Sequence, residues 1–71
     1  MMTNAALTAP SLRYNADANA AYIRLSGAEI LDSEEISPGV MLDFEAQGHI
    51  AGIEFFDAKA QLSPELLAAA S

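Results

Sequence analysis

Alternating apolar and polar residues predict extended strands over most of this chain. A first short strand is predicted over residues 11–14, followed by a turn-forming segment of Asn, Ala and Asp at 15–19. Residues 21–25 alternate with period two, which predicts a second strand. A longer and more polar extended segment is predicted over 28–36.

Two turn signals predict a hairpin in the second half of the chain. Pro38 presets φ for a turn, and Gly39 tolerates the positive φ that other residues avoid. Apolar alternation over 40–44 then leads through a four-residue connection, ending in Gly48, to a strand over 50–56. A connection of this length that ends in glycine is typical of a β-hairpin.

The last predicted strand contains Gly52, and a glycine inside a strand indicates that another backbone or a large ring approaches there. After Asp57 the period changes. Ser63 can cap a helix, Pro64 suits its first position, and Glu65 favours the positive end of its dipole. A short C-terminal helix is therefore predicted, with one apolar side made by Leu62, Leu66, Leu67 and Ala70.

Strand alternation divides the apolar residues between two faces of the sheet. One face is predicted to form the core, with the residues Ile23, Leu25, Val40, Leu42, Ile53 and Phe55. The other face is a candidate interaction face, with the residues Tyr22, Met41, Ile50 and Phe56. A sheet that is apolar on both sides needs a layer on each, which we expect the helix and a second subunit to supply. The predicted fold is α+β, a small antiparallel sheet of about four to five short strands with a C-terminal helix packed on it.

The length of 71 residues allows one domain, predicted over 11–71 behind a flexible leader at 1–10. A chain this short buries only about 60% of its unfolded surface, so its core leaves a thin margin of stability. There is no cysteine and only one histidine, so neither disulfides nor a thiolate metal site can add to that margin. Self-association is the remaining common remedy, and we expect a homodimer.

Ten acidic residues against three basic ones give a net charge of −7, which repels polyanions. We therefore expect no direct binding to nucleic acid or to an anionic membrane. The charge would attract a small basic protein, although the simpler interpretation is that the excess acid keeps a small protein soluble. No apolar run reaches the roughly 20 residues of a membrane span, and the N-terminal residues do not resemble a signal peptide. The chain is predicted to be cytoplasmic.

Few residues are candidates for chemistry. His49 is the only imidazole, and its place beside Gly48 is more typical of a solvated turn residue than of a catalyst. Asp43 and Glu54 fall on neighbouring strands, opposite the predicted core, where two carboxylates could raise one pKa or bind a divalent cation. Solvent exposure, or pairing with Arg13 or Arg24, is the simpler interpretation. We expect no enzyme activity and no cofactor.

A set of residues spread along the chain forms a recognisable combination. Its members are Tyr14, Asp17, the run 21–25, Ser37, Gly39, Val40, Leu42, Asp43, Gly48, Ile50, Gly52, Ile53, Glu54 and Ala58. The combination resembles the bacterial family known as domain of unknown function 2283, over about residues 12–60. The resemblance implies a short sheet-rich domain without an assigned activity, in a family some of whose members lie beside genes for small toxin-like proteins. It supplies no catalytic residues.

Two functional hypotheses follow from these features. The first is a non-enzymatic, homodimeric protein-interaction module, whose most specific form neutralises a small basic toxin-like protein. The alternative is a domain that binds a small molecule or a divalent cation through the carboxylates of Asp43 and Glu54, with His49 nearby.

Overall fold

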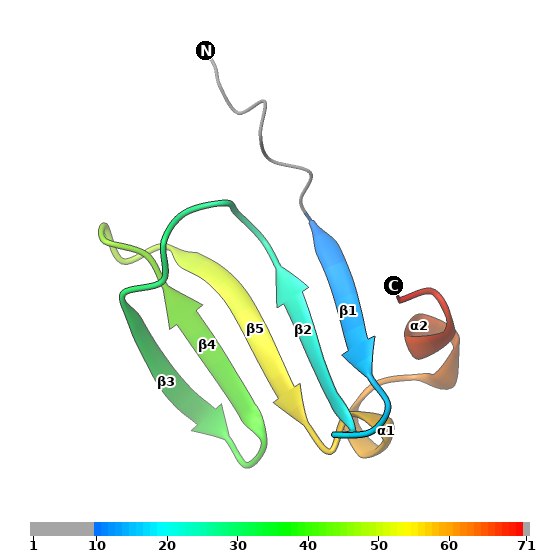
Figure 1. Cartoon of the computed structure of the whole chain (residues 1–71). Coiled ribbons are helices and arrows are strands. Elements are labelled where there is room, and N and C mark those ends of the chain that lie inside the picture. Colours follow the sequence, from blue (N-terminus) through cyan, green and yellow to red (C-terminus); the bar gives the residue numbers. More distant parts are fainter. Residues whose placement is uncertain (1–9, 71) are drawn as a thin grey trace.

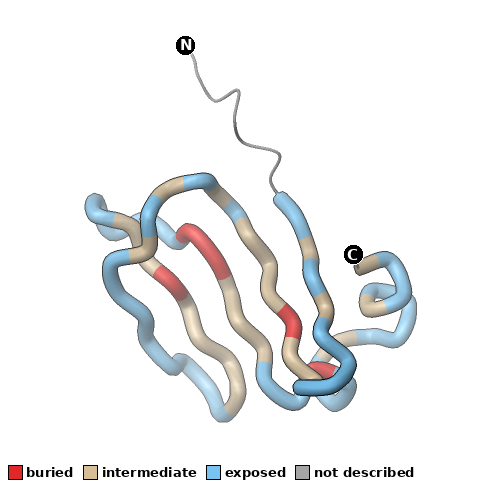
Figure 2. Tube along the Cα trace, viewed as in Figure 1, coloured by how far each residue is buried: buried red, intermediate tan, exposed pale blue. Residues whose placement is uncertain are grey.

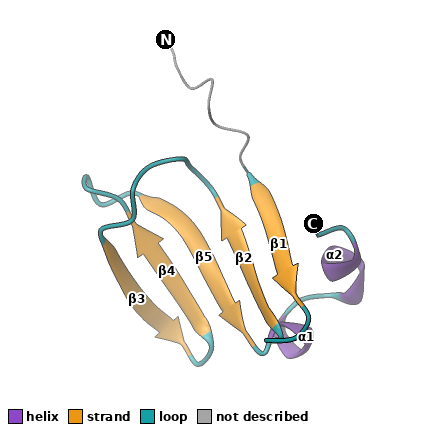
Figure 3. Ribbon diagram, viewed as in Figure 1, coloured by secondary structure: helices purple, strands orange, loops and turns teal. Residues whose placement is uncertain are grey.

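The computed structural model describes residues 10–70, so the predicted leader lies outside the described residues except for Pro10. The described chain forms five strands followed by two short helices, which confirms the α+β class (Figure 3). The elements are β1 (Ser11–Asn15), β2 (Ala20–Arg24), β3 (Asp32–Ser37), β4 (Val40–Phe44), β5 (Ile50–Phe56), α1 (Ala58–Gln61) and α2 (Pro64–Ala68).

All five strands belong to one antiparallel sheet in the order β1-β2-β5-β4-β3 (Figure 1). The last strand, β5, lies at the centre and joins two hairpins, β1–β2 and β3–β4. The edges are β1 and β3, and every residue of β3 is exposed. Three acidic residues on this edge disfavour edge-to-edge pairing between copies.

Both predicted glycine turns are confirmed. Gly39, between β3 and β4, has φ +79°, and Gly48, between β4 and β5, has φ +87°. A side chain at either position would be strained, since this region of φ strongly favours glycine. These turns fix which residues face each other across β3, β4 and β5.

The predicted start of the third strand was wrong, because β3 begins at Asp32 and not at residue 28. The guanidinium of Arg24 donates to the backbone oxygens of Ser26 at 2.5 Å and Ala28 at 2.6 Å. These bonds hold the connection after β2 in a loop, so the chain becomes extended only beyond it.

The predicted helix start is confirmed at α2, where the Ser63 hydroxyl accepts a hydrogen bond from the Leu66 amide at 3.1 Å. An additional helical turn, α1, follows β5 directly. It begins after Asp57, which has φ 54°, and the Ala58 amide donates to the Asn19 carbonyl at 2.9 Å. Asn19, with φ 52°, also lies in the left-handed region. Two non-glycine residues with positive φ, Asn19 and Asp57, thus lie where the β1–β2 turn meets α1.

The apolar face of the sheet is partly exposed. Its large residues occupy two cross-strand rows, and we define the face by Leu12, Tyr14, Ile23, Val40, Leu42, Ile53 and Phe55. No large side chain of the described residues is fully buried (Figure 2). The buried apolar residues are three alanines, Ala21, Ala51 and Ala58. The predicted core residues therefore share one face but are not sealed from solvent, and Leu25 is 39% exposed.

The helices cover the margin of the sheet. In Figure 1, α1 lies at the end of the sheet beside the β1–β2 turn, and α2 lies beyond the β1 edge. A hollow between the sheet and α2 is lined by Tyr14, Lys59, Leu62, Pro64 and Leu67, so the contact is made at the first strand. Neither helix of residues 10–70 lies over the middle strands (Figure 1). No helix among residues 10–70 is long and apolar enough to cross a membrane.

Candidate functional site

The side of the sheet opposite the apolar face carries most of the candidate polar residues. We call it the Tyr22 face and define it by Arg13, Tyr22, Arg24, Met41, Asp43 and Glu54. Register places Arg13, Tyr22, Glu54 and Met41 in one row across β1, β2, β5 and β4. Asp43 lies two residues along β4 from Met41, diagonal to Glu54.

Asp43 and Glu54 form a carboxyl pair, as the expected hairpin register implied. Asp43 is 3% exposed, and its Oδ1 accepts a hydrogen bond from the Ser33 hydroxyl of β3 at 2.5 Å. Partial burial raises the pKa of the Glu54 carboxyl, and the hydrogen bond and negative charge of Asp43 raise it further. Glu54 therefore keeps its proton to a higher pH than an isolated glutamate does, because a neighbouring negative charge disfavours its ionised form.

The Tyr22 ring covers Gly52, which confirms the predicted close approach of a ring. A β-carbon at Gly52 would lie 2.6 Å from Cζ and 2.9 Å from Cε1 of Tyr22. The phenol oxygen in turn accepts a long hydrogen bond of 3.3 Å from Nη1 of Arg24. Glycine at this position lets the ring lean across β5 toward the carboxyl pair.

Neither arginine of the Tyr22 face pairs with a carboxylate. Arg24 is engaged by the loop after β2, and the guanidinium of Arg13 makes no ion pair or hydrogen bond with any residue in the described range. The simpler interpretation of the carboxylates, pairing with these two residues, is therefore wrong for this structure.

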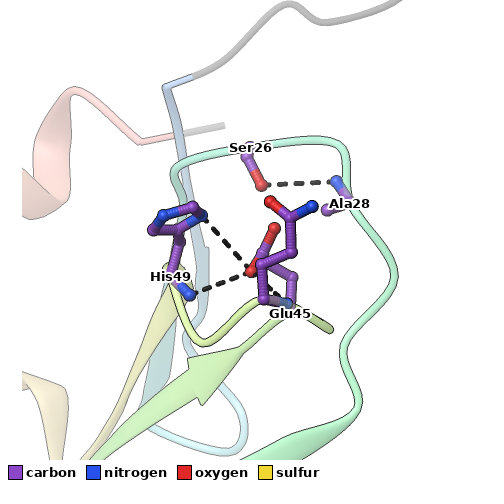
Figure 4. A network of polar contacts seen from close by, with 5 residues as sticks. Ser26, Ala28, Glu45 and His49 are labelled. Atoms are coloured by element: carbon purple, nitrogen blue, oxygen red, sulfur yellow. Dashed lines mark hydrogen bonds and ion pairs between the residues drawn. The ribbon is translucent and has the colours of Figure 1, made fainter.

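His49 lies in the turn before β5, beside Glu45 (Figure 4). Its Nδ1 is 3.4 Å from Glu45 Oε1, and its side chain is 75% exposed. The same Glu45 oxygen accepts from the amides of Gln47 at 2.7 Å and His49 at 2.9 Å. The bond from the His49 amide is the main cause that lowers the pKa of Glu45. Glu45 and His49 thus close the hairpin turn.

The predicted polar site of Asp43, His49 and Glu54 is only partly assembled. The two acids meet and the histidine does not join them. Across residues 10–70, no group of three or more His, Cys, Asp or Glu side chains is placed to hold a metal ion.

The candidate interaction face is also divided. Tyr22, Met41 and Phe56 alternate onto the Tyr22 face. Ile50 instead pairs with Phe44, beyond a register shift in the β4–β5 ladder. Phe56 and Ile50 are 47% and 44% exposed.

Sequence reasoning missed two features. The first is the role of Ser33, which a lone serine on a polar strand does not reveal. The second is a hollow of about 600 Å³ between β1, β2 and β5 on the Tyr22 face. The hollow could have been inferred from the small side chain of Ala20, which lies between Asn15 and Phe56 in the register.

A family model described as protein of unknown function (DUF2283) matches residues 11–59, which include every strand and the first residues of α1. The search of curated proteins and the search of solved structures gave no match.

Proposed function

We propose that this chain, which belongs to the DUF2283 family, is a non-enzymatic protein-interaction module that forms a homodimer through its apolar face. One observation carries the proposal. The large side chains of the central strands lie on one side of the sheet, partly exposed, and the chain's own helices reach only the margin. An uncovered apolar face of this kind favours association, because burial removes apolar surface from water.

The size of the face is compatible with a specific interface. The four strands that carry the apolar face, about 4.8 Å apart and each with about five residues rising about 3.3 Å, make a face of roughly 19 by 17 Å, or about 320 Å². Two stacked faces remove roughly 640 Å² in projection, and side-chain relief makes the accessible area larger. Specific interfaces begin at about 1,200 Å², so the proposed dimer is a small one.

A second copy is the occupant that the charge distribution favours. The apolar face carries no charged residue in its three central strands, and Glu34 of edge strand β3 is the acidic residue next to Leu42 in its row. Two apolar faces can therefore meet about a twofold axis with the nearest acidic side chain, Glu34, at the rim of the interface and not at its centre. Two stacked sheets would pack about 10 Å apart, as in a β-sandwich.

The non-enzymatic part of the proposal rests on the state of the candidate groups. Asp43 is buried and bonded to Ser33, Glu54 is engaged with Asp43, and His49 serves the turn with Glu45. These contacts give the polar residues structural roles.

We extend the proposal to a basic protein partner, the neutralisation of a small toxin-like protein being its most specific form. The exposed β3 edge supports this extension, since Asp32, Glu34 and Glu35 all lie there. Binding of a candidate basic protein should weaken with added salt and with the double change Glu34→Gln and Glu35→Gln. Binding that ignores both changes would remove this extension and leave the dimer unaffected.

The dimer is tested by light scattering on two matched variants. Leu42 points from β4 to the apolar face, and its neighbour Met41 lies on the Tyr22 face opposite Glu54. We expect about twice the 7.5 kDa chain mass for the wild type and for Met41→Lys, and the mass of one chain for Leu42→Lys. If Leu42→Lys fails to fold, the melting temperature of the wild type still decides, because it rises with protein concentration only for an associating protein. A wild type with the mass of one chain and a concentration-independent melting temperature would contradict the proposal.

A further inference from the structure

The hollow on the Tyr22 face arises from one small side chain and one leaning ring. Ala20 lies between Asn15 and Phe56 in its cross-strand row. Its side chain is much shorter than either neighbour's, so it leaves space above the sheet at the middle of the row. In the next row the Tyr22 ring leans over Gly52 and away from Ala20. The space of about 600 Å³ that results is bounded by β1, β2, β5 and the turn at residues 16–17.

The lining combines aromatic rings with an excess of negative charge. Four aromatic residues line the hollow. Tyr22 and the exposed Phe56 belong to the Tyr22 face, whereas Tyr14 and Phe55 alternate onto the apolar face. The charged groups are Arg13, Asp17 and Glu54. One positive and two negative groups give a formal charge of −1 when all three are ionised, and Asp43 adds a further carboxyl behind Glu54. Arg13 is exposed on the edge strand and has no partner within the described chain, so its guanidinium is free to turn toward solvent.

We propose that this hollow binds an organic cation, a protonated amine or a guanidinium group, with Glu54 and Asp17 as carboxylate partners and Tyr22 and Phe56 as aromatic walls. Cations are attracted to the faces of aromatic rings, and carboxylates strengthen this attraction through charge-assisted hydrogen bonds. The net charge of −7 favours the approach of a cation over that of an anion. A bare metal ion fits less well, because hard cations need six or more oxygen ligands.

Cation binding should be linked to proton release. The pKa of Glu54 is raised by burial and by Asp43, and a bound cation favours the ionised carboxylate. Affinity should therefore increase as the pH rises through the titration of Glu54. The charged groups around Glu54, taken from every neighbouring element, are Arg13 of β1, Arg24 of β2, Asp43 of β4, Glu35 of β3 and Asp17 of the first turn. Arg24 is held by Ser26 and Ala28, which leaves Arg13 as the cation that can compete.

The test is a titration of the full chain, labelled with ¹⁵N, with four probes. Butylguanidinium represents a small free organic cation, and a capped arginine-containing tripeptide represents a side chain of a protein partner. Butyrate and butanol are the anionic and neutral controls. We expect saturable chemical-shift changes at Tyr22, Glu54 and Phe56 with the cations and none there with the controls. Response to both cations assigns a side-chain ligand, and response to butylguanidinium alone assigns a small free cation.

Four substitutions sharpen the test. Glu54→Gln and Asp17→Asn should each raise the dissociation constant about tenfold, as expected for loss of a charge-assisted hydrogen bond. Arg13→Gln should lower it, because a like charge is removed. Glu29→Gln is the matched control, since it removes the same charge from an exposed loop residue far from the hollow in sequence, and it should change the constant less than about twofold.

Three results would overturn the proposal. The first is that no probe changes the chemical shifts of the hollow residues at millimolar concentration. The second is that the shift changes spread over the acidic β3 edge and respond equally to all carboxylate substitutions, which would indicate unspecific attraction. The third is that butyrate binds and that Arg13→Gln abolishes this binding, which would make the hollow an anion site. None of these outcomes bears on the dimer, which uses the opposite face.

Discussion

Replacing Gly52 by alanine should destabilise the protein if the Tyr22 ring lies over this glycine, and should stabilise it if the ring lies elsewhere. Alanine inside a strand is favoured over glycine by about 0.5–1 kcal/mol, because glycine loses more backbone freedom on folding. The new β-carbon would lie 2.6 Å from Cζ and 2.9 Å from Cε1 of Tyr22, closer than such atoms are found. The ring would have to move, and overpacking of this kind costs about 1–3 kcal/mol.

We therefore expect Gly52→Ala to lower the free energy of unfolding by up to about 2.5 kcal/mol, with a midpoint of about 1 kcal/mol, after the gain from alanine is subtracted. For a domain of this size that corresponds to a fall in melting temperature of about 4–8 °C per kcal/mol. Urea unfolding at one fixed protein concentration is the assay, since self-association would otherwise contribute.

The control is the same substitution in a Tyr22→Ala background. Without the ring, Gly52→Ala should stabilise the protein by about 0.5–1 kcal/mol. The change of sign across this double-mutant cycle measures the coupling between the two residues. A stabilising effect of Gly52→Ala in the wild type would refute the described contact.

Three further predictions concern the carboxyl pair, the strained turn and the last helix. Because the folded-state pKa of Glu54 is raised, its contribution to stability is full below the unfolded pKa and is lost as the pH rises through the folded pKa. Glu54→Gln should therefore flatten the pH dependence of thermal stability above about pH 4.5, and an unchanged slope would contradict the raised pKa of Glu54. Asn19→Ala should cost about 1–3 kcal/mol in urea unfolding, because it removes the 2.9 Å bond to Asp57 and puts alanine at φ 52°; Asn19→Gly, which keeps the conformation, should cost less. Ser63→Ala should lower the local stability of α2 by about 1 kcal/mol, because the helix loses its cap. Amide hydrogen exchange should become faster in α2 and change little in β5. An equal increase of the exchange rate in both elements would mean that α2 unfolds only together with the sheet.

Local features of the fold were predictable because each depends on neighbouring residues. Gly39 and Gly48 mark the turns through their conformational freedom, and period-two alternation placed Asp43 and Glu54 on one side. Gly52 indicated a covering ring, although not which ring. These predictions required no knowledge of how distant elements pack.

Features that depend on tertiary placement were not predictable. Apolar alternation identified the residues of the apolar face, but it could not show that the helices would lie at the β1 margin and leave that face partly exposed. The register shift at Phe44, which separates Ile50 from Met41, has no sequence signature. The left-handed conformation of Asp57, which turns the chain from β5 into α1, is equally unmarked, since aspartate rarely adopts it.

Contacts between subunits in a sample of equal parts isotope-labelled and unlabelled protein test the stacked arrangement most directly. Isotope-filtered NOE spectra should show intermolecular contacts among the methyl groups of Ile23, Leu42 and Ile53, which lie in one row at the centre of the apolar face. The absence of intermolecular contacts at concentrations where the protein is well folded would contradict this arrangement. So would intermolecular contacts confined to Met41 and the Tyr22 ring on the opposite face.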